Sequence, residues 1–181
     1  RPKPLPKTAE LPSFAGGESD FPFHLIPFPS LSLSDGHGAN LPWLQATPDP
    51  LTTATWQTWA EINVKQAEQM KIKEGDELVI ESPVGNITVL AYPHPATPPG
   101  VISVPIGQGH DSYGRWAEGR GANVFSIIAP LADKDSGALA WAATRVRIRK
   151  TGKWTRLPKF EGSAEAVQLP GAEVVKVTNS S

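Results

Sequence analysis

The stretch between Ile106 and Asn123 concentrates the residue types that could bind a ligand. Its five glycines let the backbone approach a ligand closely and leave N–H groups free for anions. The stretch lacks the strand-to-helix frame of the Rossmann and P-loop fingerprints. Two interpretations stay open, a ligand-binding loop and a loop that packs on a neighbouring domain. The polar side chains between the glycines are Gln108, His110, Arg115, Arg120 and Asn123.

No pattern in the sequence supports nucleophilic or metal-dependent catalysis. The histidines show no metal-ligand spacing such as H-x-x-x-H, and no G-x-S-x-G motif supports a serine nucleophile. The absence of cysteine excludes disulfides, thiolate metal ligands and a cysteine nucleophile within this chain. We therefore expect neither a catalytic nor a metal-ligating residue here. The histidines are His24, His37, His94 and His110.

The segment from Arg145 to Lys159 holds seven Lys or Arg residues and no acidic residue. Nucleic-acid binding would use such a run, but no aromatic residues are interleaved in a known motif, and the net charge is −1. The alternation in this segment favours an exposed strand face instead, with Arg145, Arg147 and Arg149 outward. We expect no nucleic-acid partner. No run of 18 apolar residues exists, so we also expect no direct membrane insertion.

Short alternating segments and turn signals dominate the chain and predict a mainly β fold closed into a small barrel. Residues 1–20 are proline-rich and are predicted to form an extended linker, residues 21–155 the barrel, and residues 156–181 a tail. Asn63 is predicted to cap a helix from Val64 to about Lys71, with Gln66 placed for a capping box. Expected strands cover residues 21–28, 55–62, 77–81, 87–92, 101–106 and 143–149.

Residues 59–85 carry a family resemblance, through a strand ending in Ile62-Asn63, a buried Ala67, Gly75-Asp76 and Ser82 three residues before Gly85. The later matches are Pro99 to Gly107, Asn123, Asp135 with Gly137, and Thr144 to Ile148. Together these motifs resemble the C-terminal molybdopterin-dinucleotide-binding domain of the dimethyl-sulfoxide-reductase family, over roughly residues 22–150. Met70-Lys71-Ile72 stands where the family has Leu-Gly-Ile.

This resemblance implies a six-stranded double-psi β-barrel with one or two short helices. It also implies a cap over the bis-molybdopterin guanine dinucleotide of a molybdenum or tungsten oxidoreductase in respiratory electron transfer. The metal ligand comes from another domain in that family, so this chain would not be catalytic alone and would hold no cofactor in isolation. The implied cofactor-binding residues lie in two loops, residues 35–40 and the loop ending at Asn123: His37, Asn40, Gln108, His110, Arg120 and Asn123.

Residues 41–50 and the glycine-rich loop resemble one branch of that family, the large subunits of polysulfide reductases and alternative complex III. The branch implies several partners: the remaining domains of a parent subunit, an iron–sulfur electron-transfer subunit and a membrane anchor subunit. It further implies a periplasmic or membrane-associated location. Because residue 1 is Arg and the only methionine is Met70, we expect the chain to be a fragment of that parent.

The same branch supplies an alternative function. Some of its members keep the fold without the cofactor, which would make this chain a cofactor-free structural module of a quinol-oxidising respiratory complex. A stand-alone double-psi-barrel hydrolase or decarboxylase is disfavoured, because the sequence shows no catalytic constellation.

Overall fold

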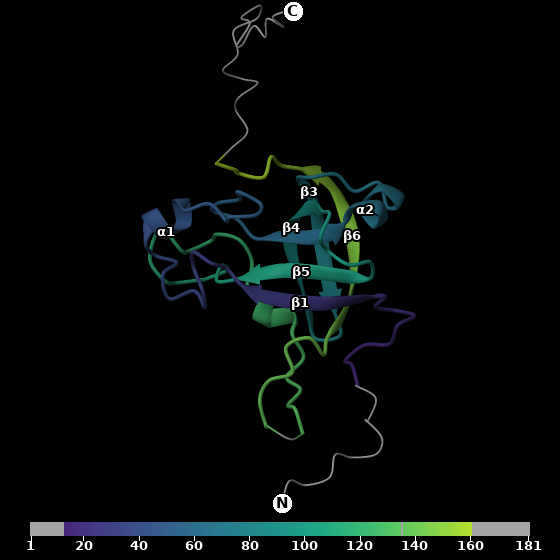
Figure 1. The fold of residues 1–181 in the computed structure, drawn as a ribbon. Coiled ribbons are helices and arrows are strands. Elements are labelled where there is room, and N and C mark those ends of the chain that lie inside the picture. Colours follow the sequence, from purple (N-terminus) through teal and green to yellow (C-terminus); the bar gives the residue numbers. More distant parts are fainter. Residues whose placement is uncertain (1–12, 135, 161–181) are drawn as a thin grey trace, which may run out of the picture.

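A computed structural model describes residues 13–134 and 136–160. Six strands form a closed ring in the order β1-β5-β2-β4-β3-β6, and β6 pairs back onto β1 (Figure 1). The predicted six-stranded β-barrel with few short helices is therefore confirmed. The strands are β1 (Phe23–Pro29), β2 (Trp59–Asn63), β3 (Asp76–Ser82), β4 (Gly85–His94), β5 (Val101–Ile106) and β6 (Arg145–Trp154).

Parallel and antiparallel pairs share the ring. β1 runs parallel to β5 and β2 runs parallel to β4, whereas β2–β5, β3–β4, β3–β6 and β1–β6 are antiparallel. Parallel neighbours need long crossover connections, so segments far apart in sequence become adjacent. Closure pairs each of the six described strands with a neighbour on both sides, so little sheet edge is left to pair with another chain.

Alternate side chains of the strands fill the barrel. This spacing of two places apolar side chains on the inner face, where burial from water stabilises the fold. The core includes the following side chains with no exposed surface: Leu25, Ile62, Leu78, Ile80, Ile102, Val104 and Val146.

The prolines of β1 sit where they remove no ladder hydrogen bond. The Leu25 amide donates to the Thr144 carbonyl on the β6 side. By alternation the nitrogens of Pro27 and Pro29 face the same side, but the β1–β6 pairing involves only residues 23 and 24 of β1. Pro27 and Pro29 thus lie on the part of β1 that does not pair with β6, which is the kind of position where a strand accommodates proline.

Helix α2 (Val64–Gln69) begins as predicted but ends two residues earlier than expected. The Asn63 carboxamide oxygen accepts hydrogen bonds from the amides of Lys65 and Gln66, at 3.1 and 3.4 Å. The predicted capping box does not close. Its Gln66 side chain instead accepts from the Gly100 amide at 2.8 Å, which ties the helix to the start of β5.

Arg145 is buried, so the prediction that it faces outward is wrong. Its guanidinium donates from Nε to the Phe21 carbonyl at 2.8 Å and from Nη2 to the Pro22 carbonyl at 3.1 Å, and its Nη1 lies 3.1 Å from His24 Nε2. Arg147 and Arg149 do face outward, and both pair with Glu81 on β3. The strand period predicted exposure correctly for two arginines, while the chain at Phe21 and Pro22, distant in sequence, covers Arg145 and accepts its hydrogen bonds.

Three further segments differ from the expected elements or extend them. A short helix, α1 (Pro42–Ala46), lies where the sequence predicted no helix, and a 3₁₀ turn, η1 (Val124–Ile127), follows the glycine-rich loop. Ala15 pairs with Thr144, and Leu157 is 1% exposed, so described residues on both sides of the expected barrel contact it. Residues 1–12 of the predicted linker and 161–181 of the predicted tail lie outside the described residues, as does Asp135. Within the described part, no helix reaches the length and apolar content of a membrane span.

Candidate functional site

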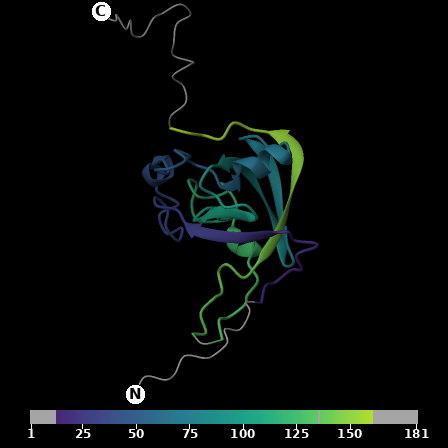
Figure 2. The ribbon, with the colours of Figure 1, turned by 45° about the vertical axis from the view of Figure 1, so that its right-hand side comes forward.

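Two loop segments meet beyond the ends of β1 and β5, around α1 (Figures 1 and 2). We call them the loop lobe, defined as residues 30–58 and 107–123. The Tyr113 hydroxyl donates to the His37 carbonyl at 3.0 Å, and the Trp116 amide donates to Asn40 Oδ1 at 3.2 Å. The two loops that the sequence placed at a cofactor are therefore in direct contact, although about 70 residues separate them in sequence.

A pair of glutamines locks the base of the loop lobe. Gln45 Nε2 lies 3.1 Å from Gln108 Oε1, and Gln108 Nε2 lies 2.6 Å from Gln45 Oε1. Gln45 is 1% exposed and also donates to the Ala39 carbonyl at 2.8 Å. The predicted site residue Gln108 is thus engaged within the protein. Gln45 was not among the residues predicted from the sequence. The feature that could have marked it is that it is a single amide side chain inside an apolar segment bounded by prolines.

The glycines of the 107–123 loop all adopt positive φ, between 59° and 114°. At Gly109 the constraint is strongest, because a Cβ there would lie 2.0 Å from the Asn123 amide nitrogen. The Gly109 amide also donates to the Arg120 carbonyl at 2.8 Å. Glycine at this position therefore lets the two limbs of the loop close upon one another.

The two predicted histidines occupy different environments. The His110 ring stacks on Tyr113 at 5.0 Å, and its Nε2 is buried with no hydrogen-bond partner among the described residues. A Cβ on Gly36 would lie 2.8 Å from that nitrogen, so the first loop covers the ring closely. His37 is exposed, with Nδ1 2.8 Å from Asp35 Oδ2.

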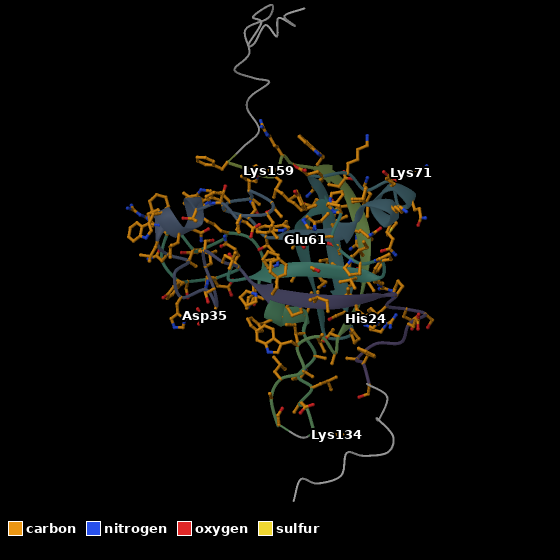
Figure 3. The ribbon with its side chains drawn as sticks, viewed as in Figure 1. His24, Asp35, Glu61, Lys71, Lys134 and Lys159 are labelled. Atoms are coloured by element: carbon orange, nitrogen blue, oxygen red, sulfur yellow. The ribbon has the colours of Figure 1, made fainter. Side chains whose placement is uncertain are left out.

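Asp35 lies at the periphery of the loop lobe, away from the barrel (Figure 3). Hydrogen bonds from the His37 amide and from its ring lower the pKa of the Asp35 carboxyl group. The carboxylate keeps its charge and fixes the turn at His37. The His37 side chain therefore belongs to an exposed surface turn.

Arg120 lies against an aromatic ring that sequence analysis did not single out. Its guanidinium carbon is 4.5 Å from the ring centre of Trp56. Its Nε is buried without an acceptor, and within the described ranges no carboxylate forms an ion pair with it. A buried donor without an acceptor is uncommon in folded proteins and marks this cation for attention.

The two predicted asparagines serve the fold. Asn40 Oδ1 accepts the Trp116 amide, as described above, and Asn123 Oδ1 accepts the Phe125 amide at 3.1 Å. Asn123 thereby caps η1 where the glycine-rich loop ends. Of the six predicted site residues, His110 and Arg120 are the two with buried side-chain atoms that have no hydrogen-bond partner among the described residues.

A small cleft, with room for little more than a water molecule, lies between the loop lobe and the barrel. Its walls combine hydroxyl, amide and carboxylate groups with two indole rings. Within residues 13–134 and 136–160, no three His, Asp or Glu side chains are grouped to hold a metal ion. Polar and aromatic lining residues include Ser30, Ser32, Gln45, Asp49, Trp56, Gln57, Trp59 and Gln108.

Comparison with known proteins gives a consistent match. The family model described as "Molydopterin dinucleotide binding domain" matches residues 44–140. The arsenate respiratory reductase molybdopterin-containing subunit of Shewanella sp. (strain ANA-3) is 35% identical over 150 residues, covering 78% of this chain and 17% of that protein. The menaquinone reductase, molybdopterin-binding-like subunit of Nitratidesulfovibrio vulgaris (strain Hildenborough) is 25% identical over 109 residues, covering 56% of this chain and 16% of that protein.

A solved structure shares the fold. Acetylene hydratase from Pelobacter acetylenicus superposes with a TM-score of 0.57 at 16% identity, covering 74% of this chain and 19% of that one. The chain therefore spans less than a fifth of the length of each of these proteins. Two of them are named as subunits. The matched region, residues 44–140, includes the glycine-rich loop and most of α1.

Proposed function

This chain belongs to the molybdopterin dinucleotide binding domain family, and from that membership we propose that its loop lobe is the cofactor-binding surface of a larger oxidoreductase. One observation carries the proposal. The two loops that the family resemblance predicted to face the cofactor meet at one end of the barrel, and the buried atoms without a hydrogen-bond partner include His110 Nε2 and Arg120 Nε in that lobe.

The residues of the loop lobe fit such a group. A dinucleotide carries an anionic diphosphate, which suits a guanidinium without an acidic partner and backbone amides in a glycine-rich loop. A pterin or a purine base presents a flat ring with polar edges, which suits contact with the indole and amide groups along the loop lobe. When bound, the pterin and its metal supply the redox chemistry, and this chain orients the group and shields it from water.

We extend the proposal to the parent protein. Its cofactor would be molybdopterin guanine dinucleotide with molybdenum or tungsten, and this chain would contribute no catalytic residue. The parent would pass electrons through an iron–sulfur subunit, with a membrane anchor subunit beside it, in a periplasmic or membrane-associated complex. The names of the relatives, a respiratory reductase subunit and a menaquinone reductase subunit, support the molybdopterin cofactor and the respiratory role.

A second candidate function is a cofactor-free structural module in a membrane-associated quinol-oxidising complex. One feature favours it. Three of the predicted cofactor contacts form side-chain hydrogen bonds within the protein itself: Asn40, Gln108 and Asn123. In that role the loop lobe would contact another subunit, and its polar side chains would stabilise the loop.

Cofactor retention by variants of the full-length parent tests the proposal. His110→Ala removes a ring with an unpartnered buried nitrogen, so we expect it to lower released pterin per polypeptide about tenfold. His94→Ala is the matched control, because His94 lies on β4 outside the loop lobe and stacks only on Tyr92 among the described rings. Equal pterin in both variants, at the wild-type level, would contradict the proposed site.

A further inference from the structure

Trp56 lies in the loop lobe in a strained conformation. Its φ is 60°, in the left-handed region that bulky residues rarely adopt. The Trp56 amide donates to the carbonyl of the buried Gln45 at 3.2 Å, which holds the segment in this geometry. Backbone strain of this kind persists where the surrounding structure enforces it, and it concentrates at functional sites. The conformation therefore calls for a reason beyond packing.

The Trp56 ring supports the Arg120 guanidinium, whose carbon lies 4.5 Å from the ring centre. A guanidinium that stacks on an aromatic ring contacts it through the flat face of the guanidinium. Its N–H donors point outward in the guanidinium plane, where they can bind an anion. The backbone of Arg120 is fixed on both sides, because its carbonyl accepts from Gly109 at 2.8 Å and its amide donates to Ala117 at 3.4 Å. Ring and backbone together leave the guanidinium little freedom.

The stack continues outward to a second cation. The Trp56 and Trp116 rings lie 6.1 Å apart, and the Arg115 guanidinium carbon lies 5.0 Å from the ring centre of Trp116. Among the described side chains, no carboxylate pairs with Arg115 or Arg120. Two positive charges are thus held by aromatic rings and left without acidic partners, which favours an anion at this face.

We propose that Trp56 is a positioning residue, which holds Arg120 in the orientation that binds the diphosphate of the dinucleotide. This inference rests on the proposed function of the loop lobe. It assigns the anion contact to Arg120 and makes the indole responsible for its placement. Trp56 itself need not touch the cofactor.

The test measures how fast the full-length parent loses pterin during dialysis, in five forms: wild type, Trp56→Leu, Trp56→Phe, Arg120→Ala and the double variant Trp56→Leu/Arg120→Ala. Trp154→Leu is the matched control, because Trp154 lies on β6 outside the loop lobe with 62% of its surface exposed. We expect about tenfold faster loss for Trp56→Leu and Arg120→Ala, and about threefold for Trp56→Phe, which keeps a weaker ring. The control should match the wild type.

The double variant separates positioning from a structural role. A residue that acts through Arg120 adds nothing once that arginine is gone, so the double variant should lose pterin as fast as Arg120→Ala alone. Multiplied effects in the double variant, or a Trp56→Leu rate equal to that of Trp154→Leu, would overturn the positioning role. A wild-type parent without pterin would instead refute the proposed function and this inference with it. Melting temperatures of all forms identify any variant that fails to fold, and Trp56→Phe then decides the outcome.

Discussion

Replacing Gly109 with alanine tests whether the glycine-rich loop is closed at its base by direct backbone contact. Gly119→Ala is the matched control in the same loop, since both glycines have positive φ, at 88° and 70°. A Cβ at position 109 would lie 2.0 Å from the Asn123 nitrogen and 2.3 Å from the Ala122 carbonyl carbon. A Cβ at position 119 would meet nothing within 4 Å. The two substitutions therefore share the conformational cost and differ in the clash.

The conformational cost of alanine in the left-handed region is about 1 kcal/mol or slightly more, and this is the whole expected effect of Gly119→Ala. Gly109→Ala must also push the two limbs of the loop apart. That movement breaks the 2.8 Å bond from Gly109 to the Arg120 carbonyl, worth about 1 kcal/mol. It also adds packing strain of about 1–3 kcal/mol. We therefore expect Gly109→Ala to destabilise the chain by about 3 kcal/mol or more.

Thermal unfolding followed by circular dichroism measures the difference. In a chain of this size 1 kcal/mol shifts Tm by about 2–4 °C. Gly119→Ala should then lower Tm by about 3 °C and Gly109→Ala by about 6–12 °C. Equal shifts for the two variants would refute the backbone contact at the base of the loop.

Three further predictions concern charged groups of the barrel. Burial alone would raise the pKa of Asp76, but hydrogen bonds from the Lys150 side chain and the Lys73 amide outweigh it and lower that pKa. Asp76 therefore stabilises the fold above its unfolded pKa of about 4, and this stabilisation is lost as the pH falls through the lower pKa of the folded state. Asp76→Asn should lower the free energy of unfolding in urea by about 2 kcal/mol at pH 7 and by little near pH 2. Burial raises the pKa of Glu61, and the hydrogen bond from Trp59 offsets this only in part, so the charged carboxylate destabilises the fold at pH 7. Glu61→Gln should therefore stabilise the chain by about 0.5 kcal/mol at pH 7 and not at pH 3. Destabilisation at pH 7 would contradict this. Arg145→Lys cannot reproduce the fork to two carbonyls, so it should lower the free energy of unfolding by about 2–3 kcal/mol, and a wild-type value would show that the fork is dispensable.

Strand positions followed from the sequence because alternation and turns are local signals. The hairpin of β3 and β4 turns between Ser82 and Gly85, as its Ser-Pro-Val-Gly sequence predicts. The start of β2 was placed four residues too early, at residue 55. Trp56 has positive φ and so cannot continue a strand, and nothing in its residue type announces that conformation.

Arg145 and Gln66 show where local rules give way to tertiary contacts. Each was assigned from its spacing, to an outer strand face and to a capping box. Arg145 instead reaches carbonyls of residues 21 and 22, and Gln66 reaches the Gly100 amide. These partners lie 34 or more residues away in sequence, and local pattern carries no information about them.

The candidate site was predicted as two loops but not as one surface. Glycine content and polar residues marked residues 107–123, and the family resemblance marked residues 35–40. The contacts that join them depend on Gln45, Trp56 and Trp116, which sequence analysis left aside. Their roles arise from the parallel β1–β5 pairing, which brings the ends of both strands to the same end of the barrel.

The central claim is that the loop lobe holds a molybdopterin dinucleotide in the parent protein. The most direct measurement expresses the full-length parent in its native host and determines molybdenum, tungsten and released pterin per polypeptide. The account predicts close to stoichiometric metal and pterin. A folded and fully assembled parent without either would contradict the account and assign the loop lobe to subunit contact.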